Sequence, residues 1–168
     1  YDRAITHGWH NREYSWQASA SIQHELRPGL SVEVGYYRTW YGNFTLTDNL
    51  AISPDDFDPY CITAPTDSRL PNSGQQICGF YDIRPSAFGL VDNFVTKASN
   101  YGKQKEIFNG VDVTMNARIR GVTVLGGLAT GSTLLERCFV VDSPQELYQC
   151  RNKQPWGAGT QLKLSAIL

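Results

Sequence analysis

The stretch YSWQASASIQHEL, residues 14–26, alternates between two classes of side chain along its whole length. Every second residue from Ser15 to Glu25 is polar, and the residues between them are apolar or aromatic, with the exception of His24. Such alternation predicts a β-strand with one apolar and one polar face. Strands of water-soluble domains usually have about 5–6 residues, so the length of this one needs an explanation.

A second alternating stretch, residues 30–46, follows the turn signal Arg27-Pro28-Gly29. A hairpin centred on Pro28 brings apolar residues opposite one another in three pairs: Leu26 with Leu30, Ile22 with Val34, and Trp16 with Trp40. The apolar faces of both strands then coincide, as the register requires when that face lies in an apolar medium. The sequence therefore predicts a long antiparallel hairpin.

Three more alternating strands are predicted over residues 106–120, 122–130 and 160–168, the first two joined by a tight turn at Arg120-Gly121. The remaining connections, residues 48–105 and 131–159, are long and rich in turn residues. Loops of this length are uncommon in compact soluble domains. Outer-membrane β-barrels, in contrast, combine short turns on the periplasmic side with long loops on the extracellular side.

Composition excludes several function classes. The 168 residues carry a net charge of −1 and no run rich in Lys or Arg, so we expect no nucleic-acid partner. No stretch of about 20 apolar residues occurs, which excludes a transmembrane helix. The chain begins at Tyr1 without a signal sequence, and we expect that a signal was removed or that the chain is a piece of a longer protein.

The four cysteines form two close pairs, Cys61 with Cys78 and Cys138 with Cys150. Neither pair has CxxC spacing, and no His pair at ligand spacing accompanies them, so a zinc site is the weaker interpretation. We expect two local disulfides formed in an oxidising compartment.

Together these patterns predict an all-β fold, a segment of an antiparallel up-and-down transmembrane β-barrel. The segment has about five strands and long disulfide-stapled extracellular loops, within a single barrel domain over residues 1–168. Four aromatic side chains at the loop end of the first hairpin are predicted to form the outer aromatic girdle: Tyr14, Trp16, Tyr36 and Trp40. An antiparallel sandwich would also give alternating strands, but the strand length and the loop asymmetry favour the barrel.

Several stretches resemble a known family: GYYRTWYGNFTLTDN (35–49), PDDFDPYCITAPTDSRLP (54–71), QICGFYDIRP (76–85), NFVTKASNYG (93–102) and FNGVDVTMNARI (108–119). They are similar to the C-terminal barrel region of TonB-dependent receptor-like outer-membrane proteins. The closest group is the Oar-like, carboxypeptidase-regulatory-domain-containing class of Gram-negative bacteria. The resemblance implies a 22-stranded barrel, a periplasm-facing plug and a TonB box. The two pairs of loop cysteines are the only family-like features that carry over.

About five strands cannot close a barrel of even eight strands. We therefore expect a segment of a longer protein or a shortened paralogue that assembles with other chains. The implied function is binding and import of a bulky nutrient, such as a siderophore or oligosaccharide, from the bacterial outer membrane with the loops extracellular. The implied partners are outer-membrane lipid, the rest of the barrel and its plug, and the TonB complex, reached through the missing N-terminal region.

Five loop aromatics are candidate contacts for a small-molecule or glycan ligand: Phe57, Tyr60, Phe80, Tyr81 and Trp156. The competing interpretation is that these rings pack inside the stapled loops. No catalytic motif, metal-ligand set or cofactor motif is present, so we expect no enzyme, no metal and no cofactor. The alternative function, from another class, is a secreted all-β binding or adhesive module.

Overall fold

The structure, a computed structural model, describes all residues 1–168. The protein is all-β, with 56% of its residues in strands, and every strand pair is antiparallel. The chain divides into two compact units, each assembled from three stretches of sequence. The sheet unit comprises Glu13–Gly42, Lys105–Glu136 and Arg151–Leu168. The loop unit comprises Tyr1–Arg12, Asn43–Gln104 and Arg137–Cys150.

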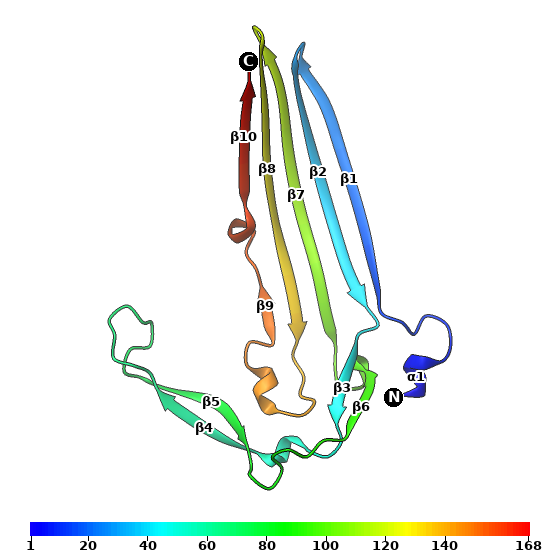
Figure 1. Cartoon of the computed structure of the whole chain (residues 1–168), viewed down its shortest axis with the longest axis vertical. Coiled ribbons are helices and arrows are strands. Elements are labelled where there is room, and N and C mark those ends of the chain that lie inside the picture. Colours follow the sequence, from blue (N-terminus) through cyan, green and yellow to red (C-terminus); the bar gives the residue numbers. More distant parts are fainter. The chain divides into compact units, whose positions relative to one another are not determined.

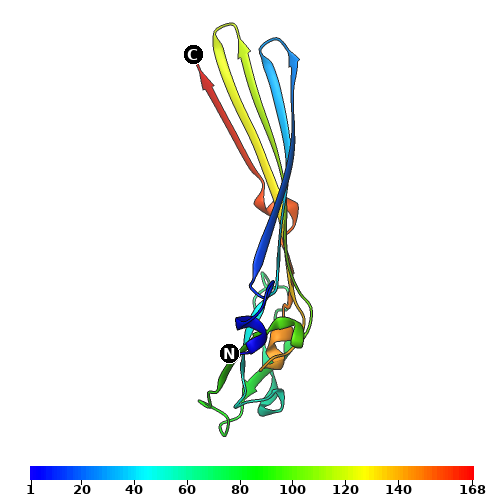
Figure 2. The same cartoon turned by 90° about the vertical axis from the view of Figure 1, so that its right-hand side faces the viewer.

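The sheet unit is built on one antiparallel sheet (Figure 1). Its strands lie in the order β1 (Tyr14–Arg27), β2 (Leu30–Gly42), β7 (Gln104–Ile119), β8 (Val122–Arg137) and β10 (Gln161–Ile167), and β9 (Arg151–Lys153) also pairs with β8. Both tight turns lie at the same end of the sheet as the C-terminus (Figures 1 and 2). The sheet is open, with β1 and β10 as its edges, and does not close into a barrel.

The register of the first hairpin is as predicted along most of its length. Ile22 lies opposite Val34, and Trp16 lies opposite Trp40. The predicted pairing of Leu26 with Leu30 is wrong, because Arg27 lies opposite Leu30 and the register shifts between Glu25 and Arg27. Gly29 has φ +80°, the value that a type II turn requires at its third residue. Turns of this type splay the strands, and the bulge at Leu26 restores their twist.

Two strand lengths differ from the prediction. The strand expected over residues 30–46 ends at Gly42, because Asn43 adopts φ +56°, a left-handed conformation that asparagine tolerates. Residues 45–49 form a separate strand of the loop unit. The strand expected over residues 122–130 continues to Arg137.

The sheet unit has no apolar core of its own. Ala117 is the only buried apolar residue in it. One face of the sheet, here named the apolar face, carries large exposed side chains that include Trp16, Ile22, Leu26, Leu162 and Leu164. The opposite, polar face carries the alternating polar residues of β1 and their cross-strand neighbours.

The loop unit contains strands where the sequence suggested only irregular loops. Its hairpins are β3 (Thr45–Asn49) with β6 (Asn93–Lys97), and β4 (Phe57–Thr63) with β5 (Gln76–Ile83). Its short helices are α1 (Arg3–Thr6) and the 3-10 turns η1 (Pro54–Asp56), η2 (Ala98–Asn100) and η3 (Pro144–Leu147); η4 (Trp156–Gly159) belongs to the sheet unit. A small core gathers Leu46, Ala98, Phe139 and Val141. None of the helices has the length and apolar character needed to cross a membrane.

Candidate functional site

The four predicted girdle residues come together on the apolar face of β1 and β2. Trp16 lies directly opposite Trp40, and Tyr36 lies opposite Ala20 on the same face. Tyr14 lies opposite Gly42, and its ring covers the position that a side chain at residue 42 would occupy. The aromatic positions are therefore adjacent, and their role at a lipid–water interface stays a prediction.

Two polar residues of the apolar face, Arg38 and Asn109, are paired next to these rings. Asn109 on β7 accepts hydrogen bonds from the Tyr36 hydroxyl (2.8 Å) and from Nη1 of Arg38 (3.3 Å). The Arg38 guanidinium also lies 6.0 Å from the centroid of the Trp40 ring, a cation–π distance. Such pairing lowers the cost of keeping Arg38 on an otherwise apolar surface.

The predicted loop aromatics do not form one surface. Tyr60 and Phe80 are cross-strand partners with ring centroids 5.6 Å apart, and Tyr148 continues the row at 5.7 Å from Phe80. Tyr81 and Phe57 lie on the opposite face of this hairpin, because neighbouring residues of a strand point to opposite sides.

Trp156 belongs to the sheet unit, whereas the other four predicted aromatics belong to the loop unit. Sequence reasoning missed Tyr148, although it lies between the two cysteines of the second pair. The structure thus brings Tyr60 and Phe80 together with a ring that was not predicted.

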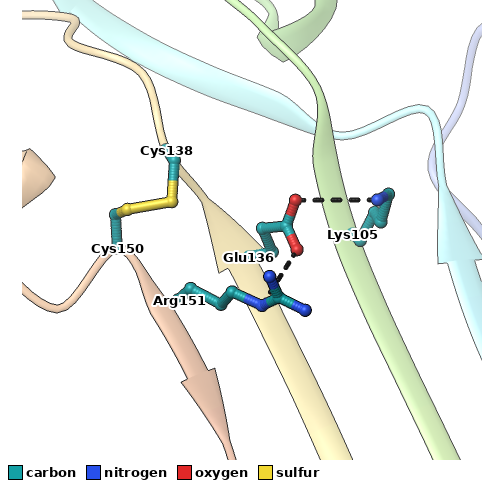
Figure 3. The surroundings of a disulfide bond; sticks show 5 residues. All are labelled: Lys105, Glu136, Cys138, Cys150 and Arg151. Carbon is teal, nitrogen blue, oxygen red and sulfur yellow. Dashed lines mark ion pairs between the residues drawn. A yellow bond between two sulfur atoms is a disulfide. The ribbon is translucent and has the colours of Figure 1, made fainter.

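Both disulfides have the expected pairing, Cys61–Cys78 and Cys138–Cys150. Each closes a short segment of the loop unit, with sequence separations of 17 and 12 residues. Figure 3 shows Glu136, two residues before Cys138 along the chain, between Lys105 (3.6 Å) and Arg151 (3.4 Å). These ion pairs join β7, β8 and β9, and their partly exposed positions limit their contribution to about 0–1 kcal/mol each.

A groove of about 460 Å³ opens on the polar face of the sheet unit and extends over β1, β2, β7 and β8. Its principal side chains are Gln17, Tyr37, Phe108, Asp112, Gln154 and Gln161. A second hollow, of about 350 Å³, lies on the same face between Gln23, Glu33 and Asn116. We name the first hollow the glutamine groove. Sequence reasoning missed it, and the available signal was the presence of glycines beside aromatics on strands β2 and β7.

Electrostatic contacts in the loop unit are structural in character. Tyr101 donates a hydrogen bond to the Asp48 carboxylate, and this contact raises the pKa of Tyr101 to about 12. Burial raises the pKa of Asp142, although its carboxylate accepts a hydrogen bond from the backbone N–H of Asn49 (2.9 Å). These bonds tie β3 to residues 98–101 and 137–150.

Comparisons with known proteins leave the geometry as the basis for a functional inference. No family model, no curated protein and no solved structure matches this chain.

Proposed function

We propose that the chain forms part of the wall of an outer-membrane β-barrel of the TonB-dependent receptor type, which binds and imports a bulky nutrient. The observation that carries the proposal is a long sheet with one predominantly apolar face and almost no buried apolar residues of its own. Four of its strands have 13 to 16 residues. At about 3.3 Å per residue, such strands can cross an apolar band of about 25 Å even when tilted.

Lipid contact accounts for the exposure of this face. Ile22 is 78% exposed, and Leu162 and Leu164 are 76% and 72% exposed. Monomeric soluble proteins rarely leave apolar patches larger than a few hundred Å² uncovered. In a bilayer, acyl chains cover these side chains, and the adjacent Trp16 and Trp40 take positions at the interface.

The polar face supports a water-filled lumen on the other side of the wall. Both hollows described above lie on this face, and most of the residues that line them are polar residues or glycines. Barrels of this kind alternate residues that face lipid with residues that face the lumen. In the proposed assembly, further strands pair with the open edges β1 and β10, because unpaired backbone groups are costly in lipid.

A secreted all-β binding or adhesive module is the rival proposal. The observation that favours it is the loop unit, which has its own core, two disulfides and the exposed rings of Tyr60 and Tyr148. A soluble module and a barrel wall differ in the medium that contacts the apolar face of β1. An experiment that reports whether lipid or water contacts this face therefore distinguishes the two proposals.

Spin labels at neighbouring positions of β1 test the proposal. Ala20→Cys places a nitroxide on the apolar face and Ser21→Cys places one on the polar face, and both residues are exposed in the structure. With the full chain in lipid vesicles, we expect oxygen, which concentrates in lipid, to relax the label at residue 20. A water-soluble nickel chelate should relax the label at residue 21.

The matched pair makes the outcome unambiguous, because the two sites differ in the face of the strand and in little else. Equal relaxation of both labels by the nickel chelate would contradict the barrel wall. So would a chain that is folded and monodisperse in buffer without detergent or lipid.

A further inference from the structure

Two aromatic rings on the polar face of the sheet unit line the glutamine groove. Phe108 on β7 and Tyr37 on β2 point to the side where the alternation otherwise places small or polar residues. Tyr37 lies opposite Gly110, and Phe108 lies opposite Thr39, so the two rings are diagonal neighbours across the strand pair. Both line the glutamine groove, and they are 39% and 37% exposed.

Glycines allow these two rings to pack closely against the sheet. A Cβ atom at Gly110 or Gly131 would lie 2.8 Å or 2.7 Å from the ring atoms of Phe108, so a larger residue at either position would displace the ring. A Cβ atom at Gly35 would lie 2.9 Å from the Tyr37 hydroxyl oxygen. One face of the Phe108 ring therefore packs against the backbone at Gly110 and Gly131, and the exposed part of the ring lines the groove.

Unpartnered amide groups surround the rings. Gln17 comes from β1, Gln154 comes from the segment that links β9 to β10, and Gln161 is the first residue of β10. The side-chain amides of these three residues make no hydrogen bond within the protein. An amide offers both donors and an acceptor, so together they can bind a ligand rich in hydroxyl groups.

The charge of the groove narrows the class of ligand. Asp112 is the one ionisable carboxyl group in its lining, and no Lys or Arg side chain lines it. A groove without cationic side chains gives an anionic ligand no charge-assisted hydrogen bond, and Asp112 repels such a ligand. Its volume of about 460 Å³ lies within the range of about 300–1,000 Å³ typical of small-molecule sites.

We propose that the glutamine groove binds a neutral carbohydrate chain, whose sugar rings lie against Phe108 and Tyr37 and whose hydroxyls bond to Gln17, Gln154 and Gln161. Flat apolar faces of sugar rings match aromatic faces, and their equatorial hydroxyls match the amides around them. The inference rests on the proposed function, because a lumen keeps this face in contact with water and solutes. It narrows the imported nutrient to an uncharged oligosaccharide.

Binding to the full chain in zwitterionic detergent micelles tests the inference, since a detergent without a sugar headgroup does not compete. The probes are cellohexaose, maltohexaose and xylohexaose as neutral chains, and a galacturonic acid hexamer as the charged chain, each measured by calorimetric titration. We expect at least one neutral chain to bind and the charged chain to bind at least tenfold more weakly. Gln17→Ala should weaken the neutral chain about three- to tenfold.

Matched variants separate ligand contact from packing. Gln23→Ala lies on the same face of β1 outside the groove and should bind as the wild type does. Phe108→Leu keeps an apolar cover over the glycines but removes the ring face, and should weaken binding about tenfold, whereas Phe108→Tyr should retain it.

Three results would overturn the inference. The first is that none of the neutral chains binds, and the second is that the charged chain binds more tightly than the neutral chains do. The third is that Gln17→Ala and Phe108→Leu both bind the neutral chain as tightly as the wild type does. In the last case the Phe108 ring serves only to cover the glycines. The spin-label experiment at Ala20 and Ser21 does not involve any sugar. If the labels report lipid on one face and water on the other but no neutral chain binds, the carbohydrate ligand is rejected and the barrel wall is retained.

Discussion

The sheet unit and the loop unit achieve stability in different ways. The sheet unit has a regular alternation, long backbone ladders and no disulfide, and it leaves its large apolar side chains exposed. The loop unit has short strands, a small buried core around Phe139, and two disulfides. The loop unit therefore carries its own apolar interior, whereas the sheet unit exposes most of its large apolar side chains.

The greatest loss of folding stability is expected from a substitution in the core of the loop unit. Phe139 is 7% exposed, packs with Leu46 and Val141, and fills the space beside Gly102. Phe139→Ala should lower the free energy of unfolding of this unit by about 3–5 kcal/mol, because it removes a buried ring and leaves a cavity. Urea unfolding followed by amide hydrogen exchange measures the loss.

Val34→Ala is the matched truncation in the sheet unit. Val34 is 46% exposed on the apolar face, so its loss should change stability in detergent by about 0.5 kcal/mol or less. Equal losses from the two truncations would remove the contrast between a unit with a core and a unit without one.

Removal of the first disulfide has the next largest effect. Replacing both Cys61→Ser and Cys78→Ser frees a segment with a sequence separation of 17 residues, which should cost the loop unit about 3 kcal/mol. Hydrogen exchange should accelerate in β4 and β5, while the amides of β1 and β2 keep their protection. Lost protection in β1 and β2 would mean that the sheet unit also depends on the staple.

Among the changes in the loop unit, the smallest loss concerns Tyr101, which donates a hydrogen bond to Asp48. Tyr101→Phe should cost about 1.5 kcal/mol at pH 7, because a hydrogen bond to a charged group is lost. The pKa of Tyr101 is raised to about 12, so the folded state holds this proton more strongly than the unfolded chain does. The stabilisation is therefore complete below pH 10 and declines as the pH rises toward 12.

Urea unfolding between pH 8 and pH 12 should show this decline in the wild type and a shallower one in Tyr101→Phe. Tyr60→Phe is the control, since the Tyr60 ring packs on Phe80 and its hydroxyl makes no hydrogen bond within the protein. If the free energy of unfolding of Tyr101→Phe declined at alkaline pH as steeply as that of the wild type, the titrating group responsible for the decline would not be Tyr101.

The alternation was enough to predict the long strands and most of the first hairpin's register, because side chains on a sheet repeat every two residues. It did not reveal the bulge at Leu26, which follows from the geometry of the turn at Gly29. The strands of the loop unit escaped prediction because they are short and lack alternation. What holds β4 and β5 together is the Cys61–Cys78 disulfide and the backbone pairing of the two strands, and local alternation predicts neither.

The candidate site was predicted less well than the fold. The girdle positions followed from parity alone, and Trp16 and Trp40 are indeed neighbours. The glutamine groove could not be predicted from the alternation of apolar and polar residues. Phe108 breaks this alternation, and the position of its ring depends on the space left by Gly131, a residue of another strand. Only the pairing of β7 with β8 brings that glycine under the ring.

The pairing of β2 with β7 has a consequence for the order of folding. The turns at Pro28 and Gly121 make β1–β2 and β7–β8 local hairpins, whereas Trp40 meets Ile107 only after all of residues 43–103 have left the sheet and returned. Closing such a loop costs entropy before any ladder forms. We expect each hairpin to form early and their junction late. The oxidation of Cys61 and Cys78 shortens the effective length of the excursion, and so determines how quickly the two halves of the sheet meet.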